Sequence, residues 1–185
     1  IKDELFKILL SEIPSYGIRL MKDLGILDSI LPELKYTIAF EQHSPNHDKD
    51  VFEHTLCVLD GVSSDIEIRL AALFHDIGKP HSLTIDEEGR GHFYGHEKIS
   101  VDIAKTAHTR LRCSNELIDG VLLLIGDHMT KSRSMKDKGL KRLIARLGED
   151  RIFKLLELQI ADRSCTNGLA DVEYLVKRED EIQRI

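Results

Sequence analysis

Apolar residues recur along this chain at the three- and four-residue spacing of one helix face, and five such stripes reach a histidine or an aspartate near a helix end. Asp162, for example, continues the stripe of Leu155 and Leu158. No alternation of apolar and polar residues lasts long enough to build a sheet. These patterns predict an all-α bundle whose core receives polar side chains from several helices.

Residues that start and stop helices divide the chain into segments. Side chains able to cap a helix N-terminus precede the predicted helices, namely Ser15, Asp48 or Asp50, Asp65, Ser114, Asp137 and Asp150. Gly78 and Pro80 are typical of a helix end. Helices are predicted to follow these caps, over 2–12, 16–24, 49 or 51 to 60, 66–77, 96–112, 115–128, 138–148, 151–162 and 169–184, with a loop or a small hairpin at 81–95.

The composition excludes some classes of protein. A formal net charge of −6 and a pI of about 5.8 do not indicate a nucleic-acid binder by overall charge. No apolar run approaches the roughly 20 residues of a membrane span, and the N-terminus does not resemble a signal peptide, so we expect a cytoplasmic protein without a membrane partner. The start at Ile1 instead of methionine leaves open a fragment of a longer chain.

The three cysteines, Cys57, Cys113 and Cys165, are far apart, odd in number and without a CxxC pair. This pattern predicts neither a thiolate zinc site nor a disulfide framework. A reducing compartment is therefore expected.

The polar side chains that end the apolar stripes have the chemistry of metal ligands: His54, His75, Asp76, His96, His128 and Asp162. Any one inward histidine is more often a hydrogen-bonded core residue than a ligand, so the joint pattern carries the prediction. A first ion would be held by four of them, His54, His75, Asp76 and Asp162. A second would be held by His96 and His128, with Asp76 bridging both ions. Nitrogen and oxygen ligands without sulfur favour Mn, Ni, Co, Fe, Mg or Zn, so we expect one or two such divalent ions.

Such a site predicts metal-assisted hydrolysis of a phosphate ester, with Asp76 and Lys79 as catalytic residues. Lys79 lies just past the helix end, where it could contact a phosphate oxygen or, with equal weight, be a solvated cation favoured by the helix dipole. Asp127 is a candidate for orienting His128 or a water, or else a surface residue. His92, in the glycine-rich loop, is a candidate for gating the site or protonating a leaving group, or else a loop histidine without a role.

Residues 131–146 are basic in an otherwise acidic chain, with seven lysines and arginines and a single acid, Asp137. Lys138, Lys141 and Arg142 are the candidate contacts to a phosphate or an RNA backbone. The alternative is a solvated helix face beside a loop. No aromatic residue lies in the run to stack on bases, which argues against tight single-strand binding.

These motifs resemble a known family. The order histidine, histidine–aspartate, aspartate at 54, 75–76 and 162 is similar to that of the HD-domain metal-dependent phosphohydrolases. More narrowly, the stretches 13–21, 31–34, 50–56, 69–80 and 91–97 resemble the C-terminal neck and body of bacterial CCA-adding enzymes, the tRNA nucleotidyltransferases. That family's polymerase head, with its Gly-Ser motif and paired aspartates, has no counterpart in these 185 residues, so nucleotide addition is not assigned to them.

The resemblance implies an HD metal-binding helical bundle at 48–165, an N-terminal neck-like helical extension at 1–47, and a C-terminal helix at 166–185 packed on the bundle. The expected function is a divalent-metal-dependent phosphohydrolase acting on a nucleotide-type phosphomonoester or a 2′,3′-cyclic phosphodiester. The alternative is the tRNA-binding body of a tRNA nucleotidyltransferase, with a structural or vestigial metal site. The expected partners are therefore a small phosphate ester or nucleotide and, in the alternative, tRNA.

Overall fold

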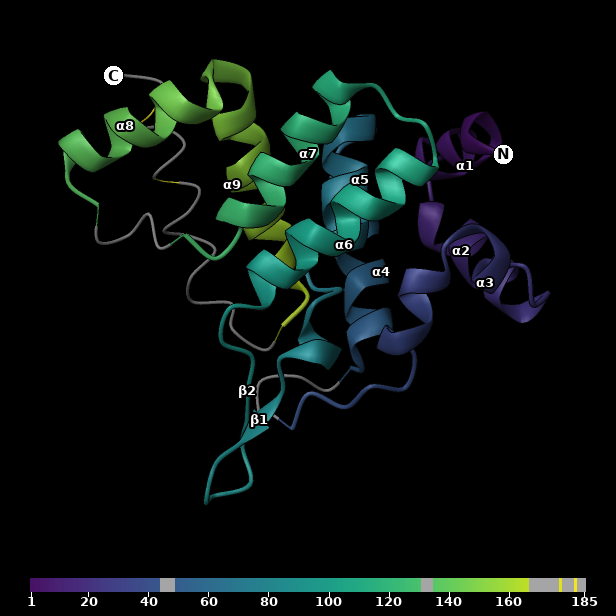
Figure 1. The fold of residues 1–185 in the computed structure, drawn as a ribbon. Coiled ribbons are helices and arrows are strands. Elements are labelled where there is room, and N and C mark those ends of the chain that lie inside the picture. The colour runs from purple at the N-terminus through teal and green to yellow at the C-terminus, as the bar shows by residue number, and fades with distance from the viewer. Residues whose placement is uncertain (44–48, 131–134, 167–176, 178–181, 183–185) are drawn as a thin grey trace.

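The computed structural model describes residues 1–43, 49–130, 135–166, 177 and 182, and Figure 1 shows it as a helical bundle. Its described α-helices are α1 (Lys2–Leu9), α2 (Pro14–Asp23), α3 (Leu27–Ile30), α4 (Val51–Gly61), α5 (Ile66–Phe74), α6 (His96–Arg110), α7 (Asn115–Asp127), α8 (Asp137–Leu147) and α9 (Glu149–Ser164). Two 3₁₀ helices, η1 (Pro32–Thr37) and η2 (Lys79–His81), and a two-stranded hairpin complete the described elements. The prediction of an all-α fold is confirmed.

Three of the predicted helix caps are present. The side chain of Asp50 accepts a hydrogen bond from the third N–H of α4, that of Asp65 from the second and third of α5, and that of Ser114 from the third of α7. Each cap satisfies an N–H group that a helix start leaves without a partner, which typically stabilises the helix by about 1 kcal/mol. The caps therefore determine where three helices of the core begin.

Three predicted helix starts are wrong. Helix α2 begins at Pro14, whose fixed φ suits the first helical position, and the N–H of Ser15 instead donates to Asp60 Oδ1 at 3.0 Å. Helix α8 begins at Asp137 itself, and α9 begins at Glu149. In both, the aspartate predicted as the cap lies inside the first turn, where the helix dipole also favours a carboxylate. Aspartate suits both the cap and the first turn, so the residue type alone does not show at which residue the helix begins.

The glycine-rich loop before α6 forms a small hairpin, one of its two predicted forms. Strand β1 (Thr84–Ile85) pairs antiparallel with β2 (Gly91–His92), and the hairpin extends beyond one end of the bundle (Figure 1). The N–H of Gly91 donates to the carbonyl of His43 at 2.8 Å, which ties the hairpin to the segment before α4. A Cβ at position 91 would lie 2.5 Å from the carbonyl oxygen of Gln42, so this close approach requires glycine.

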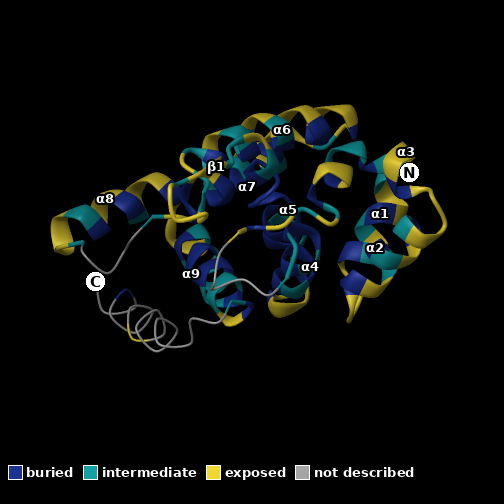
Figure 2. Cartoon of the chain, turned by 90° about the horizontal axis from the view of Figure 1, so that it is seen from below, coloured by how far each residue is buried: buried dark blue, intermediate teal, exposed yellow. Residues whose placement is uncertain are grey.

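Helix α5 lies at the centre of the bundle. Residues 68–74 are all buried, and the helix packs against α4, α7 and α9. Figure 2 shows the buried residues concentrated in these helices, while α8 is exposed along one side. Because burial of apolar surface is the dominant favourable term in folding, α5 is held by its neighbours and its C-terminal end is a fixed position in the core.

Cys57 on α4 forms a disulfide with Cys165, which directly follows α9. The prediction against disulfides was wrong for this pair, because the two residues are separated by 108 positions but α4 packs against α9. Cys113 is a free thiol in the described part of the chain. A reducing compartment no longer follows from the cysteines, and cytoplasmic localisation stays a prediction.

None of the described helices is both long and apolar enough to cross a membrane. The predicted helix at 169–184 lies outside the described residues, apart from Lys177 and Ile182, and so do residues 131–134 of the basic run. The domain boundaries predicted at 47/48 and 165/166 therefore stay predictions.

Candidate metal centre

The structure brings all six predicted metal ligands together, and we call them the ligand cluster. Their nitrogen and oxygen atoms form two groups, in each of which the atoms lie within 4.8 Å of one another. The first group is His54, His75, Asp76 and Asp162, and the second is Asp76, His96 and His128. They come from α4, the end of α5, the start of α6, the end of α7 and the last turn of α9. Five segments that are distant in sequence therefore converge on one place in the core.

Asp76 lies between the two groups and belongs to both. Its Oδ2 is 3.5 Å from His54 Nε2 and 3.3 Å from His75 Nε2. Its Oδ1 is 3.2 Å from His96 Nε2 and 3.7 Å from His128 Nε2. Each carboxylate oxygen thus faces a different group, which is the arrangement that a bridging ligand of two ions requires.

Asp162 completes the first group from α9. Its Oδ1 lies 3.0 Å from His54 Nε2 and 3.9 Å from His75 Nε2. Ligand atoms that share one ion at about 2.1 Å lie roughly 3 Å apart when they are neighbours in an octahedron, so the distances in the cluster match a common ion. The donor set of imidazole nitrogens and carboxylate oxygens fits a divalent cation.

Glycine at position 78 allows α6 to approach the end of α5. A Cβ at Gly78 would collide with the carbonyl oxygen of His96, and the Gly78 N–H donates to Ser100 Oγ at 2.9 Å. The first residue of α6 is thereby held beside Asp76. The same glycine that was predicted to end a helix also determines the distance between two ligands.

Three histidines are held by the same hydrogen bond, from Nδ1 to the carbonyl oxygen three residues earlier. The distances are 2.8 Å for His75, 2.7 Å for His96 and 2.7 Å for His128. A carbonyl oxygen only accepts, so Nδ1 carries the proton and Nε2 of the neutral ring presents a lone pair. Among the described residues, His75 Nε2 is buried without a hydrogen-bond partner. Such a nitrogen suits a metal ion, because this carbonyl contact is what orients ligating imidazoles.

The facing imidazoles of His96 and His128 give a second indication of a cation site. Their Nε2 atoms lie 3.2 Å apart. With both Nδ1 atoms protonated, two lone pairs would face each other unless a proton or a cation lies between them. Either way the position attracts positive charge, so the second group also fits a divalent ion.

Electrostatics keep both carboxylates of the cluster ionised. Burial alone would raise the pKa of Asp76, but the neighbouring charges of His75 and Lys79 hold that pKa well below its usual value. Burial would likewise raise the pKa of Asp162, and the hydrogen bond with His54 is the main effect that lowers it. The pKa of His75 is lowered by burial but raised more by the Asp76 carboxylate, for a net increase. The two carboxylates therefore attract positive charge to the cluster.

Lys79 is buried, at 8% exposure, and not the solvated cation that was one of its two predicted roles. Its Nζ lies 2.7 Å from Asp76 Oδ2 and 2.8 Å from Gln42 Oε1. The same ammonium lies 5.5 Å from the centre of the Phe93 ring. Sequence reasoning missed Gln42, because a glutamine in a polar loop has no periodicity that would indicate burial.

Asp127 and His92 lie outside the ligand cluster. Asp127 is buried and accepts hydrogen bonds from Arg146 Nη2 at 2.7 Å and from Thr130 Oγ1 at 3.2 Å. It joins the end of α7 to α8, whereas the His128 ring is oriented by a backbone carbonyl instead. This corrects the prediction that Asp127 orients His128, and its burial also excludes the alternative of a surface residue. Its role toward a water stays a prediction.

His92 pairs with an acid of its own hairpin. Its Nε2 lies 2.7 Å from Asp86 Oδ2, and its ring stacks on that of Tyr94. The hydrogen bond from His92 lowers the pKa of Asp86. Gating and leaving-group protonation by His92 both stay predictions.

Lys138, Lys141 and Arg142 are exposed on α8, and we call them the basic face of α8. The opposite side of the helix buries Leu140 and Leu143 against the bundle. Figure 1 shows α8 on the far side of the molecule from α1 to α3. The described part of the predicted basic surface is therefore a solvent-facing helix side that a large polyanion could reach.

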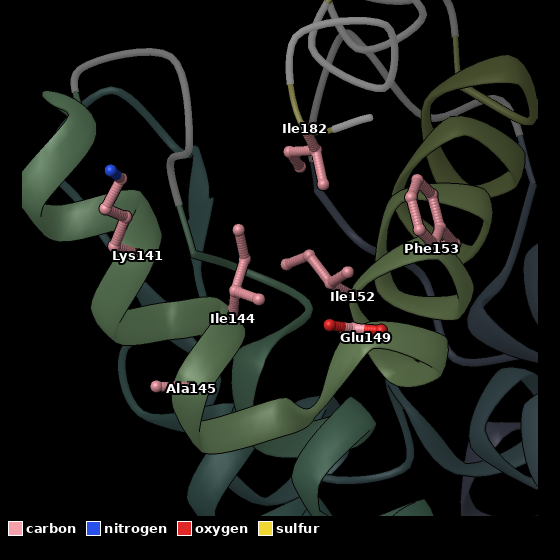
Figure 3. A pocket seen from close by; sticks show the side chains of 7 residues that line it. All are labelled: Lys141, Ile144, Ala145, Glu149, Ile152, Phe153 and Ile182. Atoms are coloured by element: carbon pink, nitrogen blue, oxygen red, sulfur yellow. The ribbon is translucent and has the colours of Figure 1, made fainter. Parts of the chain in front are cut away.

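A cavity of about 650 Å³ lies between α8 and α9 (Figure 3). Its lining in the described structure is Lys141, Ile144, Ala145, Glu149, Ile152, Phe153 and Ile182. The lining is largely apolar and includes none of the ligand cluster. The cavity is therefore separate from the candidate metal centre.

Comparison with known proteins identifies two families along the chain. Residues 51–167 match the family described as HD domain. Residues 1–38 match the family described as probable RNA and SrmB-binding site of polymerase A. The HD match contains all six residues of the ligand cluster.

Curated relatives are similar over nearly all of this chain. A CC-adding tRNA nucleotidyltransferase of Thermus thermophilus is 35% identical over 175 residues, 91% of this chain and 40% of the relative. An A-adding tRNA nucleotidyltransferase of Deinococcus radiodurans is 31% identical, over 94% of this chain and 41% of the relative. A multifunctional CCA protein of a Janthinobacterium species is 30% identical, over 92% and 43%. The chain thus spans about two fifths of the length of these relatives, and the resemblance seen in the sequence is confirmed.

Proposed function

This chain belongs to the HD domain family, and from that premise we propose that it is a divalent-metal-dependent phosphohydrolase. Its substrate would be a nucleotide-type phosphomonoester or a 2′,3′-cyclic phosphodiester. The single observation that carries the proposal is the position of Asp76, with one oxygen facing each group of ligands. Structural ion pairs do not need two groups of imidazole nitrogens around one carboxylate.

Divalent ions bound there would act as Lewis acids on the phosphate oxygens and lower the pKa of a water toward neutrality. The chain's own residues hold the geometry. The Nδ1 contacts of His75, His96 and His128 prevent those rings from turning. Asp76 fixes the spacing of the two groups, and Asp162 with His54 closes the first of them. Lys79 supplies a positive charge within 2.7 Å of Asp76, where a non-bridging phosphate oxygen would be stabilised as its charge grows.

The test measures bound metal and turnover on the same samples. The purified chain is assayed with Mn, Ni, Co, Fe, Mg or Zn against cyclic nucleotides, nucleotides and generic phosphomonoesters. Asp76→Ala and Asp162→Ala are expected to lose bound metal and at least about a hundredfold in turnover. Asp65→Ala, which removes the cap of α5 and an ion pair with Lys154 but no member of the ligand cluster, controls for lost fold stability. Turnover that persists in both cluster variants would refute the proposal.

A second proposed function is binding of tRNA, either beside the hydrolase activity or with a structural metal site. The observation that favours it is the exposed basic face of α8 in a chain of net charge −6. The relatives are tRNA nucleotidyltransferases, and residues 1–38 match an RNA-binding family. Because the chain spans only about two fifths of those relatives, their nucleotide addition is not part of the proposal.

Salt dependence tests the tRNA proposal. Replacing Lys138, Lys141 and Arg142 with glutamine should weaken tRNA binding and reduce the slope of log K against log salt, by at most about 0.9 for each lost phosphate contact. The matched control replaces three other exposed cations of the same types with glutamine: Lys98, Lys105 and Arg112. The net charge changes equally in both triple variants. Equal weakening of tRNA binding in the two would therefore mean that only the total charge matters, and not the basic face of α8.

A further inference from the structure

Lys79 has a fixed set of partners although it is a long and flexible side chain. An ammonium group offers three N–H donors. Asp76 Oδ2 lies within reach at 2.7 Å and Gln42 Oε1 at 2.8 Å, while the Phe93 ring lies 5.5 Å away. A buried ammonium is costly unless its charge and donors are satisfied, so these three groups decide where the charge lies.

Gln42 reaches Lys79 from another part of the chain. It lies in the segment between η1 and α4, and its side chain is only 2% exposed. Its Nε2 donates to the carbonyl oxygen of Lys49 at 3.3 Å. That contact orients the amide, because the nitrogen faces a carbonyl and the oxygen must then face the ammonium.

The segment around Gln42 is itself held in place over the site. The next residue, His43, accepts the N–H of Gly91 from strand β2 at 2.8 Å. Phe40 and Phe93 meet edge to face, with ring centres 6.5 Å apart. Residues 40–43 and the hairpin are thus held together, and each supplies a contact to the Lys79 ammonium, Gln42 from the first and Phe93 from the end of the second.

Asp76 alone would not hold Lys79 in one position. Its Oδ2 also faces His54 and His75, so this oxygen is shared between the ammonium and the first ligand group. The amide oxygen of Gln42 is the neutral acceptor that does not belong to the ligand cluster. It can keep Lys79 beside Asp76 without adding negative charge against an incoming phosphate.

We propose that Gln42 is a positioning residue that places the Lys79 ammonium to bind the phosphate group of the substrate. The inference rests on the proposed function, because it assigns the phosphate contact to Lys79. It extends that function by making Gln42, which is outside the ligand cluster, a determinant of phosphate affinity. Gln42 itself touches neither the ligand cluster nor the phosphate.

The experiment measures binding of inorganic phosphate to metal-loaded protein by titration calorimetry. Gln42→Met keeps the length of the side chain and removes the acceptor, and it should raise the Kd for phosphate by about tenfold, the usual effect of losing a hydrogen bond to a charged group. Gln42→Asn withdraws the acceptor by one methylene and serves as a second variant if Gln42→Met does not fold. Thr37→Val, which removes another buried hydrogen bond from the same region, is the matched control and should leave the Kd unchanged.

A double-mutant cycle separates positioning from a structural role. In a Lys79→Met background, Gln42→Met should change the Kd by less than about twofold, because the group that it positions is gone. The inference is overturned if Gln42→Met weakens phosphate binding equally in the wild type and in Lys79→Met. It is also overturned if Gln42→Met does not weaken phosphate binding in the wild type. Wild-type protein that binds no phosphate overturns it as well. If phosphate binding follows this pattern but no ester is hydrolysed, the role of Gln42 is supported and the proposed hydrolase function is refuted.

Discussion

The ligand cluster and the basic face of α8 use charged residues in opposite ways. In the cluster, Asp76 is 2% exposed and every charge has a partner of opposite sign or a hydrogen bond. On α8, the lysines and the arginine of the basic face are exposed to solvent. Desolvation makes buried charges depend strongly on one another, while water and salt screen exposed ones. The position of a charge, and not the type of residue that carries it, therefore decides how much it matters to this fold.

The largest effect is expected for Asp76→Ala. The substitution leaves the buried Lys79 ammonium without its counter-charge, so the free energy of unfolding should fall by about 3–5 kcal/mol. Bound metal should be lost in the same variant. Urea denaturation and metal analysis measure the two effects, with Asp65→Ala as a control that should cost about 1 kcal/mol. Unchanged stability in Asp76→Ala would mean that the buried charges are not coupled.

The next effect concerns the disulfide beside the cluster. Cys57 lies one turn after His54 on α4, and Cys165 one turn after Asp162, so the bond joins the two helices that close the first ligand group. Cys57→Ser should lower the free energy of unfolding by about 2–4 kcal/mol, because the unfolded chain loses a long closed loop. Denaturation under oxidising conditions measures this, and Cys113→Ser is the matched control for removing a thiol. If both serine variants are equally stable, the bond does not constrain the fold.

A buried histidine outside the cluster should make stability depend on pH. His108 packs against the ring of Phe74, and burial lowers its pKa from 6.5 to about 4. Between these values the unfolded chain binds a proton that the folded protein does not. The free energy of unfolding therefore falls as the pH falls through this range, by up to about 1.4 kcal/mol per pH unit.

His108→Leu isolates that contribution from the other histidines. Between pH 7.5 and pH 5, the wild type should lose roughly 2 kcal/mol more stability than the variant does. Urea denaturation at the two pH values gives the difference. Parallel losses in the two proteins would show that His108 is not held neutral by burial.

The smallest effect on stability is expected at the basic face of α8. Replacing Lys138, Lys141 and Arg142 with glutamine should change the free energy of unfolding by less than about 0.5 kcal/mol, because exposed charges are screened. A thermal or urea denaturation curve measures it. A fall of several kcal/mol in the free energy of unfolding would show that these exposed charges matter to stability as much as the buried ones do.

Much of the fold could be predicted from local patterns. Asp50, Asp65 and Ser114 cap the helices that the sequence predicts there, because a cap interacts with N–H groups only two or three residues away. The apolar stripes indicated which sides of the helices face the core. The six ligands could be nominated because each stands near a helix end in line with such a stripe. Asp137 and Asp150 show the limit, since an aspartate suits the cap and the first turn alike.

Local patterns thus predict the helices, their buried faces and the residue types of the ligand cluster, because helix caps and helix faces depend on residues within about four positions. Two contacts form only in the folded chain, where Gln42 meets Lys79 across 37 positions and Cys57 meets Cys165 across 108. Neither contact has a local signature. Both follow from how α4, α9 and the segment before α4 pack, and packing is a property of the whole folded chain.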